Sequence, residues 1–243
     1  MERKSCGKRL CVGNQDMNPK KPLLGGKMIT HEKDIEYFTQ YPAPILELLQ
    51  STQFTNCNST ITFFGPMIYF LIRALGCEQV LEIGHAECYT AYYMAHAVKD
   101  NGIRFGMKKN MYYGIDIVQT EKAKKNLTDA GLPNTIINMD SMKLTSETFK
   151  EITFDLIFQD GSHQTDHILH EFDVLWPQLK DKGKGYFLQH DVYGPGEEGC
   201  RIIKNRIDKG EIKAEYIRLN CVYGMALIRK MDNYNYNKRH WRD

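Results

Sequence analysis

The sequence predicts an α/β protein with a doubly wound, Rossmann-like and mostly parallel sheet that has helices on both faces. Three observations carry this prediction. Short apolar runs alternate with stretches of helical spacing from Pro66 to Lys209. Several of these runs end in an acid or a glycine, which is typical of strands that meet a ligand-binding edge. The last two runs, 212–219 and 223–230, are joined by a short turn and predict a C-terminal antiparallel hairpin.

The first predicted helix of this domain begins at Pro66, because proline suits the first turn of a helix, and it ends at Gly76. Its apolar stripe consists of Met67, Phe70, Leu71, Ala74 and Leu75. The apolar run 79–83 follows as a buried strand.

The second helix is expected to run from Tyr89 to Val98 and to end near Asp100-Asn101-Gly102, a run of residues that favour turns. The segment from Lys99 to Met111 is predicted to be a solvated polar loop that lies away from the ligand-binding edge.

The remaining elements alternate between strand and helix. Further strands are expected at 112–117, 135–139, 154–158 and 185–189. Further helices are expected at 119–130, 141–150, 167–179 and 199–209.

At 243 residues the chain can form one large domain with an N-terminal extension. We divide it into an arm with short helices at 1–58, for which a lid or a dimer contact is the expected role, a main domain at 59–231 and a polar tail at 232–243. Short helices are expected around 31–50. The net charge of +2 argues against a protein that binds polyanions.

The seven cysteines are scattered, and no apolar signal or membrane-spanning segment is evident in the sequence. Reduced thiols in a cytoplasmic protein are the simplest interpretation. Cys6 and Cys11 lack a second Cys/His pair at a spacing that suits a structural metal.

The strand at 79–83 leads into a glycine corner, which is the part of the chain best suited to hold a ligand. Gly84 allows close approach of the backbone, and the following helix start offers unpaired N–H groups. No Gly-Lys-Ser/Thr follows, so the corner is not a phosphate loop. It is not the dinucleotide fingerprint either, because Ala86 and Cys88 stand where further glycines are expected. The turn must therefore tolerate a side chain at Cys88.

Acids stand at the ends of all five predicted parallel strands. Since parallel strands end at one edge of a sheet, the side chains concerned point to a single site. They are Glu82, Asp116, Asp140, Asp160 and Asp191.

These residues together resemble a class I S-adenosylmethionine-dependent methyltransferase over roughly residues 60–230. Glu82-Ile83-Gly84 with Tyr89-Thr90 is similar to the first motif of catechol and caffeoyl-coenzyme A O-methyltransferases. The later segments look like small-molecule and sugar O-methyltransferases of the macrocin type. The segments that carry this second likeness are Asp160-Gly161-Ser162-His163, His190-Asp191 and Gly224-Met225-Ala226-Leu227.

The resemblance implies S-adenosylmethionine as the cofactor. In this reading Gly84 passes close to the methionine part, Glu82 lies near its ammonium group or organises the turn, and Asp116 binds the ribose hydroxyls. Asp140 and Ser141 would contact the adenine amino group, although they could instead merely cap the next helix. The implied cofactor-binding residues are Glu82, Gly84, His85, Tyr89, Thr90, Asp116, Ile117, Asp140, Ser141 and Asp160.

The resemblance also raises the possibility of a divalent cation such as Mg²⁺. Asp160 and Asp191 match two carboxylates that bind a metal in the related enzymes. The third ligand there directly follows the second carboxylate, where this chain has Val192, which cannot coordinate. Water could complete a Mg²⁺ site, or His163 or His190 could complete a site for a softer metal.

Methyl transfer to a hydroxyl requires removal of a proton, by a general base or with the help of a metal. His163 is the first candidate for the base, because it aligns with the catalytic lysine of the catechol enzymes. His190 is the alternative, and Asp160 belongs to the same catalytic group. His167 and His170 fall on the next predicted helix and have weaker claims.

The sequence thus favours an O-methyltransferase that acts on a small hydroxylated molecule such as a sugar, a phenol or a natural-product intermediate. No nucleic acid or membrane partner is expected, and a homodimer is possible. One alternative is an RNA or protein methyltransferase, which is disfavoured because Asp160-Gly161-Ser162-His163 replaces the Asn/Asp-Pro-Pro-Tyr/Phe segment of amino-methylating enzymes. The other is a binding protein of the same fold without catalysis, which Cys88 and Val192 would suit.

Overall fold

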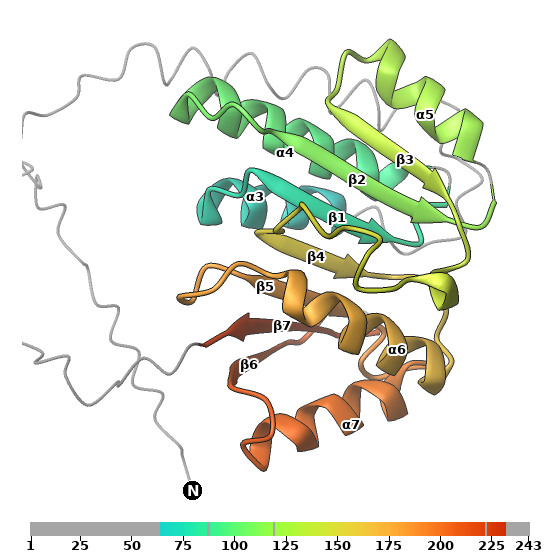
Figure 1. Cartoon of the computed structure of the whole chain (residues 1–243), viewed down its shortest axis with the longest axis vertical. Coiled ribbons are helices and arrows are strands. Elements are labelled where there is room, and N and C mark those ends of the chain that lie inside the picture. Colours follow the sequence, from blue (N-terminus) through green and yellow to red (C-terminus); the bar gives the residue numbers. More distant parts are fainter. Residues whose placement is uncertain (1–63, 87, 119, 222, 232–243) are drawn as a thin grey trace, which may run out of the picture. The chain divides into compact units, whose positions relative to one another are not determined.

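The computed structural model describes residues 64–86, 88–118, 120–221 and 223–231 of the chain (Figure 1). The predicted arm at 1–58, the helices expected around 31–50 and the tail at 232–243 lie outside these residues, so the proposed division into domains stays a prediction.

One mixed sheet organises the described part of the chain. Its strands are β1 (Gln79–Ile83), β2 (Met111–Asp116), β3 (Asn134–Asn138), β4 (Leu156–Gln159), β5 (Tyr186–His190), β6 (Ala214–Leu219) and β7 (Met225–Lys230). Their order is β3-β2-β1-β4-β5-β7-β6. The first five are parallel, and β7 runs antiparallel to both β5 and β6. The predicted fold class, including the C-terminal hairpin, is confirmed.

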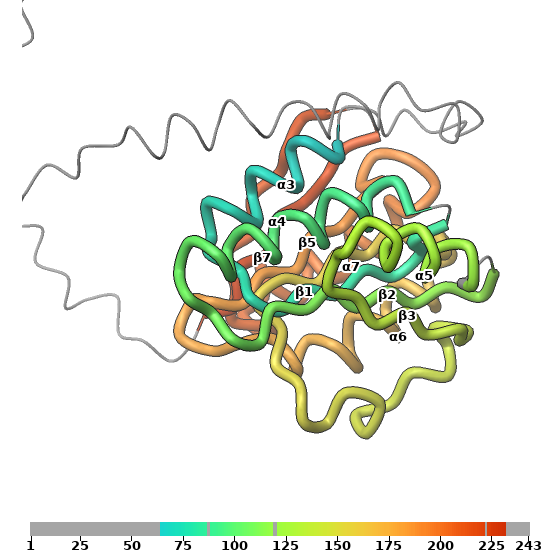
Figure 2. The backbone as a smooth tube through the Cα atoms, turned by 90° about the horizontal axis from the view of Figure 1, so that it is seen from above, coloured from blue at the N-terminus to red at the C-terminus, as the bar shows by residue number. Residues whose placement is uncertain are grey.

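Helices cover both faces of this sheet. They are α3 (Phe64–Leu75), α4 (Tyr89–Phe105), α5 (Thr120–Asp129), α6 (Thr165–Leu175) and α7 (Glu197–Asp208), with short 3-10 turns η3 (Ser141–Lys143) and η4 (Trp176–Gln178). Figures 1 and 2 show α3 and α4 on one side of the sheet and α6 on the other. Among the described residues no helix has the length and apolar character needed to cross a membrane.

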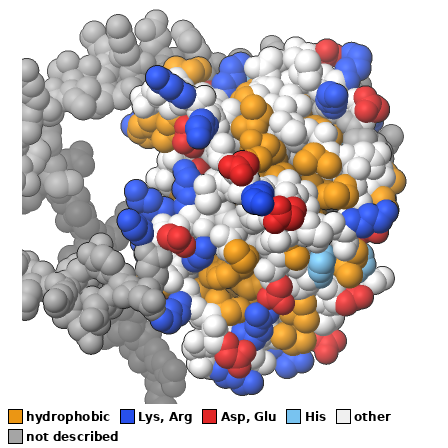
Figure 3. Space-filling model, viewed as in Figure 1, with side chains coloured by type: hydrophobic (Ala, Val, Ile, Leu, Met, Phe, Trp, Pro, Cys, Tyr) orange, Lys and Arg blue, Asp and Glu red, His pale blue; other side chains and the backbone are white. Residues whose placement is uncertain are grey.

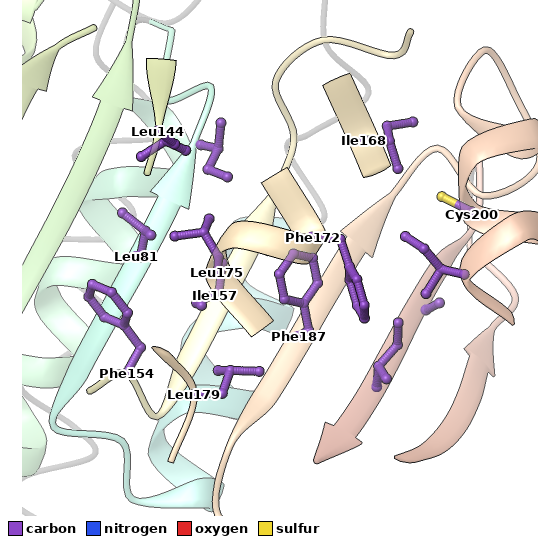
Figure 4. Packing of buried hydrophobic residues seen from close by; sticks show 14 of the residues in the cluster. Leu81, Leu144, Phe154, Ile157, Ile168, Phe172, Leu175, Leu179, Phe187 and Cys200 are labelled. Atoms are coloured by element: carbon purple, nitrogen blue, oxygen red, sulfur yellow. The ribbon is translucent and has the colours of Figure 1, made fainter. Parts of the chain in front are cut away.

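The core on the α6 side joins helix to sheet through large apolar side chains (Figure 4). Phe172 of α6 packs on Phe187 of β5 with ring centroids 4.9 Å apart and stacks on Trp176 at 5.0 Å. Burying a side chain of this size contributes about 1.5–3 kcal/mol, so this layer fixes α6 and the loop that precedes it.

Helix α4 does not stop near residue 100 as predicted, but continues to Phe105. Asp100 and Asn101 are fully buried, and they bind α3 and the turn that follows it. Tyr69 donates a hydrogen bond to Asp100 at 2.6 Å, and Asn101 donates to the carbonyl of Cys77 at 2.8 Å. The turn-forming residues were misread because tertiary contacts satisfy their polar groups within a helix. The predicted solvated loop at 99–111 is therefore helical in its first half.

Helix α3 exists as predicted but buries a different face. Its buried residues include Phe64, Ile68 and Ile72, whereas Phe70 of the predicted stripe is 61% exposed. The helix is apolar around most of its circumference, so periodicity could not tell which face packs against α4.

The prediction of a helix at 141–150 is wrong. Only η3 is helical there, and turns follow it. The hydroxyl of Thr148 accepts a hydrogen bond from the backbone N–H of Thr145 at 3.0 Å, a local bond that competes with helix formation. Leu144 and Phe149 anchor the segment in the core.

The turn after β1 brings two strand ends into direct backbone contact. Gly84 has φ +84°, and a Cβ there would lie 2.3 Å from the carbonyl oxygen of Asp160 and 2.6 Å from the α-carbon of Gly161. The N–H of Asp160 donates to the carbonyl of Ile83 at 3.0 Å. Only glycine satisfies both the conformation and the close approach.

We therefore expect Gly84→Ala to lower the free energy of unfolding by about 3 kcal/mol or more, since the new methyl group meets backbone that cannot move aside. Urea unfolding measures this change. Gly210→Ala is the matched control: its φ is +74°, but nothing lies within 4 Å of the added Cβ. Its free energy of unfolding should fall by only about 1 kcal/mol, because alanine is disfavoured in the left-handed conformation. Equal losses in the two variants would contradict this account of the corner.

Candidate active site

A cavity of about 390 Å³ lies at the C-terminal ends of the central strands. This size is within the range of ligand sites, about 300–1,000 Å³. Its wall is formed by Ile83, Gly84, Ala86, Ile115, Asp116, Ile117, Met139, Asp140, Ser141, Asp160, Gly161, Ser162 and His167. Six of the predicted cofactor-binding residues are brought together in it: Gly84, Asp116, Ile117, Asp140, Ser141 and Asp160.

Asp116 is held rigidly at the end of β2. Its Oδ2 accepts a hydrogen bond from the N–H of Ala86 at 2.8 Å, and its Oδ1 accepts from the N–H of Val118 at 2.9 Å. Each carboxylate oxygen keeps further acceptor capacity. The backbone therefore presents to the cavity a fixed carboxylate that two neighbouring hydroxyl groups could reach.

Asp140 has two roles in the structure. Its Oδ1 accepts a hydrogen bond from the N–H of Met142 at 3.0 Å and so caps η3, which is the capping alternative considered above. Asp140 and Ser141 also line the cavity. Ile117 also lines the cavity, and its exposed apolar side chain could cover a planar group.

The other predicted cofactor contacts are not part of the cavity wall. Glu82, His85 and Thr90 are buried, and Tyr89 packs edge-on against Tyr93. Glu82 accepts a short hydrogen bond from the Tyr112 hydroxyl. Burial raises the pKa of Glu82 well above its usual range, although this hydrogen bond opposes the rise. Glu82 thus joins the end of β1 to β2 through Tyr112, and its role toward a cofactor stays a prediction.

The turn after β1 adopts a left-handed backbone at two positions where the dinucleotide fingerprint would have glycines. Ala86 has φ +42° and Cys88 has φ +76°. Such conformations cost non-glycine residues of the order of 1 kcal/mol each. Cys88 is buried, and its sulfur lies 4.0 Å from Nδ1 of His85. The turn thus tolerates a side chain at Cys88, as the sequence required.

Three side chains form a compact cluster beside the cavity. One ligand atom each from Asp160, His190 and Asp191 lies within 4.8 Å of the others. Nδ1 of His190 is 3.0 Å from Oδ1 of Asp160 and 3.1 Å from Oδ2 of Asp191, yet among the described residues neither nitrogen of the ring has a partner at hydrogen-bonding angles. Burial lowers the pKa of His190, but the two carboxylates outweigh it and raise that pKa above its ordinary value.

His163 approaches the same cluster from the loop after β4. Its Nε2 lies 3.2 Å from Oδ2 of Asp191, and its side chain is 40% exposed. The His190 side chain is only 6% exposed and is enclosed by the rings of Phe64 and Phe158. Of the two candidate bases, His163 is therefore the one that a dissolved molecule can reach.

Val192 is buried in the core and contributes nothing to the cluster. The third polar group comes instead from His190, the residue before Asp191. Asp191 has φ +56°, an uncommon conformation that aspartate tolerates better than most residues. This turn directs its carboxylate toward both histidines.

His167 is the residue that sequence reasoning underrated. It lies in the first turn of α6 and lines the cavity, and its buried Nδ1 has no hydrogen-bond partner within the described ranges. The sequence could have indicated this position for His167, because a helix that follows β4 begins at the ligand-binding edge of the sheet. Gly161 and Ser162 line the cavity for the same reason. His170 instead approaches the carbonyl of Leu144 at 3.2 Å and lies outside the wall.

Comparison with known proteins gives the family of this domain. Residues 81–192 match the family described as a methyltransferase domain. This range contains the glycine corner, Asp116 and the whole Asp160–Asp191 cluster. Residues 81–192 therefore carry a methyltransferase domain. No curated protein sequence matches the chain.

Solved methyltransferase structures share the fold. The match to a Staphylococcus aureus protein proposed to be a caffeoyl-CoA O-methyltransferase covers 82% of this chain and 98% of that one, with 19% identity and a TM-score of 0.61. The Podospora anserina methyltransferase PaMTH1, bound to S-adenosylhomocysteine, matches with 16% identity over 86% of this chain and all of that one (100%), with a TM-score of 0.61.

A third structure is the O-methyltransferase TomG from Streptomyces achromogenes, which is involved in tomaymycin synthesis and is in complex with S-adenosylmethionine. It matches with 17% identity over 72% of this chain and 82% of that one, with a TM-score of 0.58. At these identities the likeness concerns the fold.

Replacing Asp116 in the methyltransferase should weaken cofactor binding. In Asp116→Ala, the loss of charged hydrogen bonds should raise the dissociation constant for S-adenosylhomocysteine by roughly tenfold or more, as measured by calorimetry. Asp129→Ala is the control, because Asp129 is an exposed acid that pairs with Lys125 on the surface of α5. Unchanged affinity in Asp116→Ala would remove Asp116 from the cofactor site.

Proposed function

We propose that this protein transfers a methyl group from S-adenosylmethionine to a hydroxyl group of a small molecule. The observation that carries the proposal is the position of Asp160, which belongs both to the cavity wall and to the cluster with His190 and Asp191. A cofactor in the cavity and an acceptor at the cluster would therefore both lie next to Asp160.

The cavity residues fit the cofactor. The backbone of Gly84 lines the cavity, Asp116 offers a fixed acceptor for the ribose, and Asp140 with Ser141 would contact the adenine. S-adenosylmethionine, when bound, supplies a methyl carbon activated by its sulfonium. What remains for the protein is to hold the acceptor oxygen in line with that carbon and to remove its proton.

His163 is the proposed base. Asp191 at 3.2 Å from Nε2 favours the tautomer with the proton on Nε2, which leaves Nδ1 able to accept a proton from the acceptor hydroxyl. The carboxylate also stabilises the imidazolium that forms, as an acid partner does in other histidine bases.

The cluster of Asp160, His190 and Asp191 fits a divalent cation. In the part of the chain that the structure describes, the two buried nitrogens of His190 have no hydrogen-bond partner, and two carboxylates lie beside the ring. These three residues would hold the ion, which lowers the pKa of a bound hydroxyl and orients it. The imidazole favours a transition metal over Mg²⁺, which prefers oxygen ligands.

The surface charge supports a small acceptor. On the face seen in Figure 3, acidic and basic side chains are interspersed. A surface that binds nucleic acid gathers Lys and Arg along one stripe.

We expect His163→Gln to reduce methyl transfer by roughly a hundredfold, because glutamine can bond to Asp191 but cannot accept the proton. Transfer of a labelled methyl group from S-adenosylmethionine to a panel of hydroxylated acceptors measures this loss. Affinity for S-adenosylhomocysteine should stay unchanged, since His163 is outside the cavity wall. Normal turnover in the variant would exclude His163 as the base.

The protein should bind Mn²⁺ roughly tenfold more tightly than Mg²⁺, as measured by calorimetry. Asp191→Asn should weaken the binding of both ions. His190→Asn should reduce the difference between the affinities for Mn²⁺ and Mg²⁺. Asp208→Asn, at an exposed acid paired with Lys204, is the control and should leave both affinities unchanged. Absence of Mn²⁺ binding, or tighter binding of Mg²⁺, would contradict the proposed ligand set.

A further inference from the structure

A buried acid lies between helix α6 and the sheet, and neither the proposed base nor the proposed cation site uses it. Glu171 of α6 is 0% exposed. Ile168 and Phe172 of the same helix belong to the apolar core. A carboxylate in such surroundings is unfavourable, because burial removes the water that solvates its charge.

The carboxyl group of Glu171 is hydrogen-bonded through one oxygen. Its Oε2 accepts a hydrogen bond from Nε2 of Gln159 at 2.7 Å, and Oε1 of Gln159 accepts one from Nε2 of Gln189 at 3.0 Å. Among the described residues, Oε1 of Glu171 has no partner at hydrogen-bonding angles. A glutamine at position 171 could accept the bond from Gln159 equally well. The packing therefore needs an acceptor at this position but does not need an acid.

The unpartnered oxygen lies directly behind the wall of the cofactor cavity. Gly161 lines the cavity, and a Cβ on Gly161 would lie 3.6 Å from Oε1 of Glu171. A sphere with the volume of the cavity is about 9 Å across, so a cation inside would lie within roughly 12 Å of this oxygen, where a unit charge changes affinity about tenfold at an effective dielectric constant of about 20.

The charge of Glu171 depends on pH. Burial raises the pKa of Glu171 above its ordinary value, and four side chains oppose the rise: Ser141, Gln159, His167 and His170. The two histidines are its titratable neighbours on α6. The groups that approach from β4, β5 and η3 are neutral, and Arg206 of α7 pairs with Asp173 at 2.6 Å. A raised pKa brings the change between acid and carboxylate closer to neutral pH.

We propose that Glu171 is a specificity residue that makes the cavity prefer S-adenosylmethionine to S-adenosylhomocysteine. The first carries a positive charge on sulfur, and the second, which lacks the methyl group, does not. The carboxylate form of Glu171 attracts this charge from behind Gly161 without touching the cofactor. The product of methyl transfer is then held more weakly than the cofactor it must make room for. This inference rests on the proposed function and adds to it the means by which the site distinguishes cofactor from product.

The test measures both affinities by calorimetry at about pH 8 and about pH 5. At the higher pH, Glu171→Gln should lower the preference for S-adenosylmethionine roughly tenfold, because glutamine keeps the bond to Gln159 and removes the charge. At the lower pH the native protein and the variant should show the same preference, since the acid form of Glu171 is as neutral as glutamine. A purely structural role would change the preference equally at both pH values.

Asp173→Asn is the matched control. It removes an acid from the same helix, but the Asp173 side chain is 52% exposed and pairs with Arg206. The preference of this variant should equal that of the native protein at both pH values, because solvent screens an exposed charge.

The native protein alone provides a second readout. A bound sulfonium lowers the pKa of a nearby carboxyl group, so at about pH 6 binding of S-adenosylmethionine should release more protons than binding of S-adenosylhomocysteine. Calorimetry in two buffers that differ in ionisation enthalpy counts these protons. Glu171→Gln should reduce the difference between the two counts.

An unchanged preference in Glu171→Gln, an equal loss at both pH values, or equal proton counts for the two ligands in the native protein would overturn the proposed role of Glu171. If the two ligands bind and one of these results is found, the proposed function stands and only this inference is refuted. If neither ligand binds the native protein, the methyl-transfer proposal fails and this inference fails with it.

Discussion

The site depends on the close contact between Gly84 and the backbone of Asp160. A Cβ at Gly84 would lie 2.3 Å from the Asp160 carbonyl, so the turn after β1 and the end of β4 can meet only because this residue is glycine. The contact places the first corner of the cofactor cavity against the acid that begins the cluster with His190 and Asp191. On this account, cofactor binding and proton removal are adjacent because two strand ends touch.

The remaining parts of the corner hold this arrangement with ordinary residues. Ala86 and Cys88 adopt left-handed conformations that glycines would adopt without strain. Asp116 accepts the N–H of Ala86, and Tyr112 bonds to Glu82 beneath the turn. These contacts stabilise a backbone that the local sequence disfavours, which explains how the corner keeps its shape without a glycine-rich motif.

Local pattern was enough to predict the strands and the acids at their ends. β1 occupies the predicted range, and the predicted hairpin forms. Contacts that depend on distant residues were not predictable. Asp100 and Asn101 look like helix breakers until Tyr69 and the carbonyl of Cys77 are placed beside them. The cluster shows the same limit: the sequence named both His163 and His190 as possible partners of Asp160 and Asp191, and only the fold shows that His190 lies 3.0 Å from Asp160.

The most direct test of the central claim is whether cation and methyl group sit together at Asp160. Mn²⁺ bound to the protein would enhance the relaxation of protons on bound S-adenosylmethionine, and NMR measures this effect proton by proton. The account predicts that the methyl protons on sulfur relax fastest and that the adenine protons, held near Asp140, relax least. Faster relaxation of the adenine protons, or no enhancement at any proton, would contradict it.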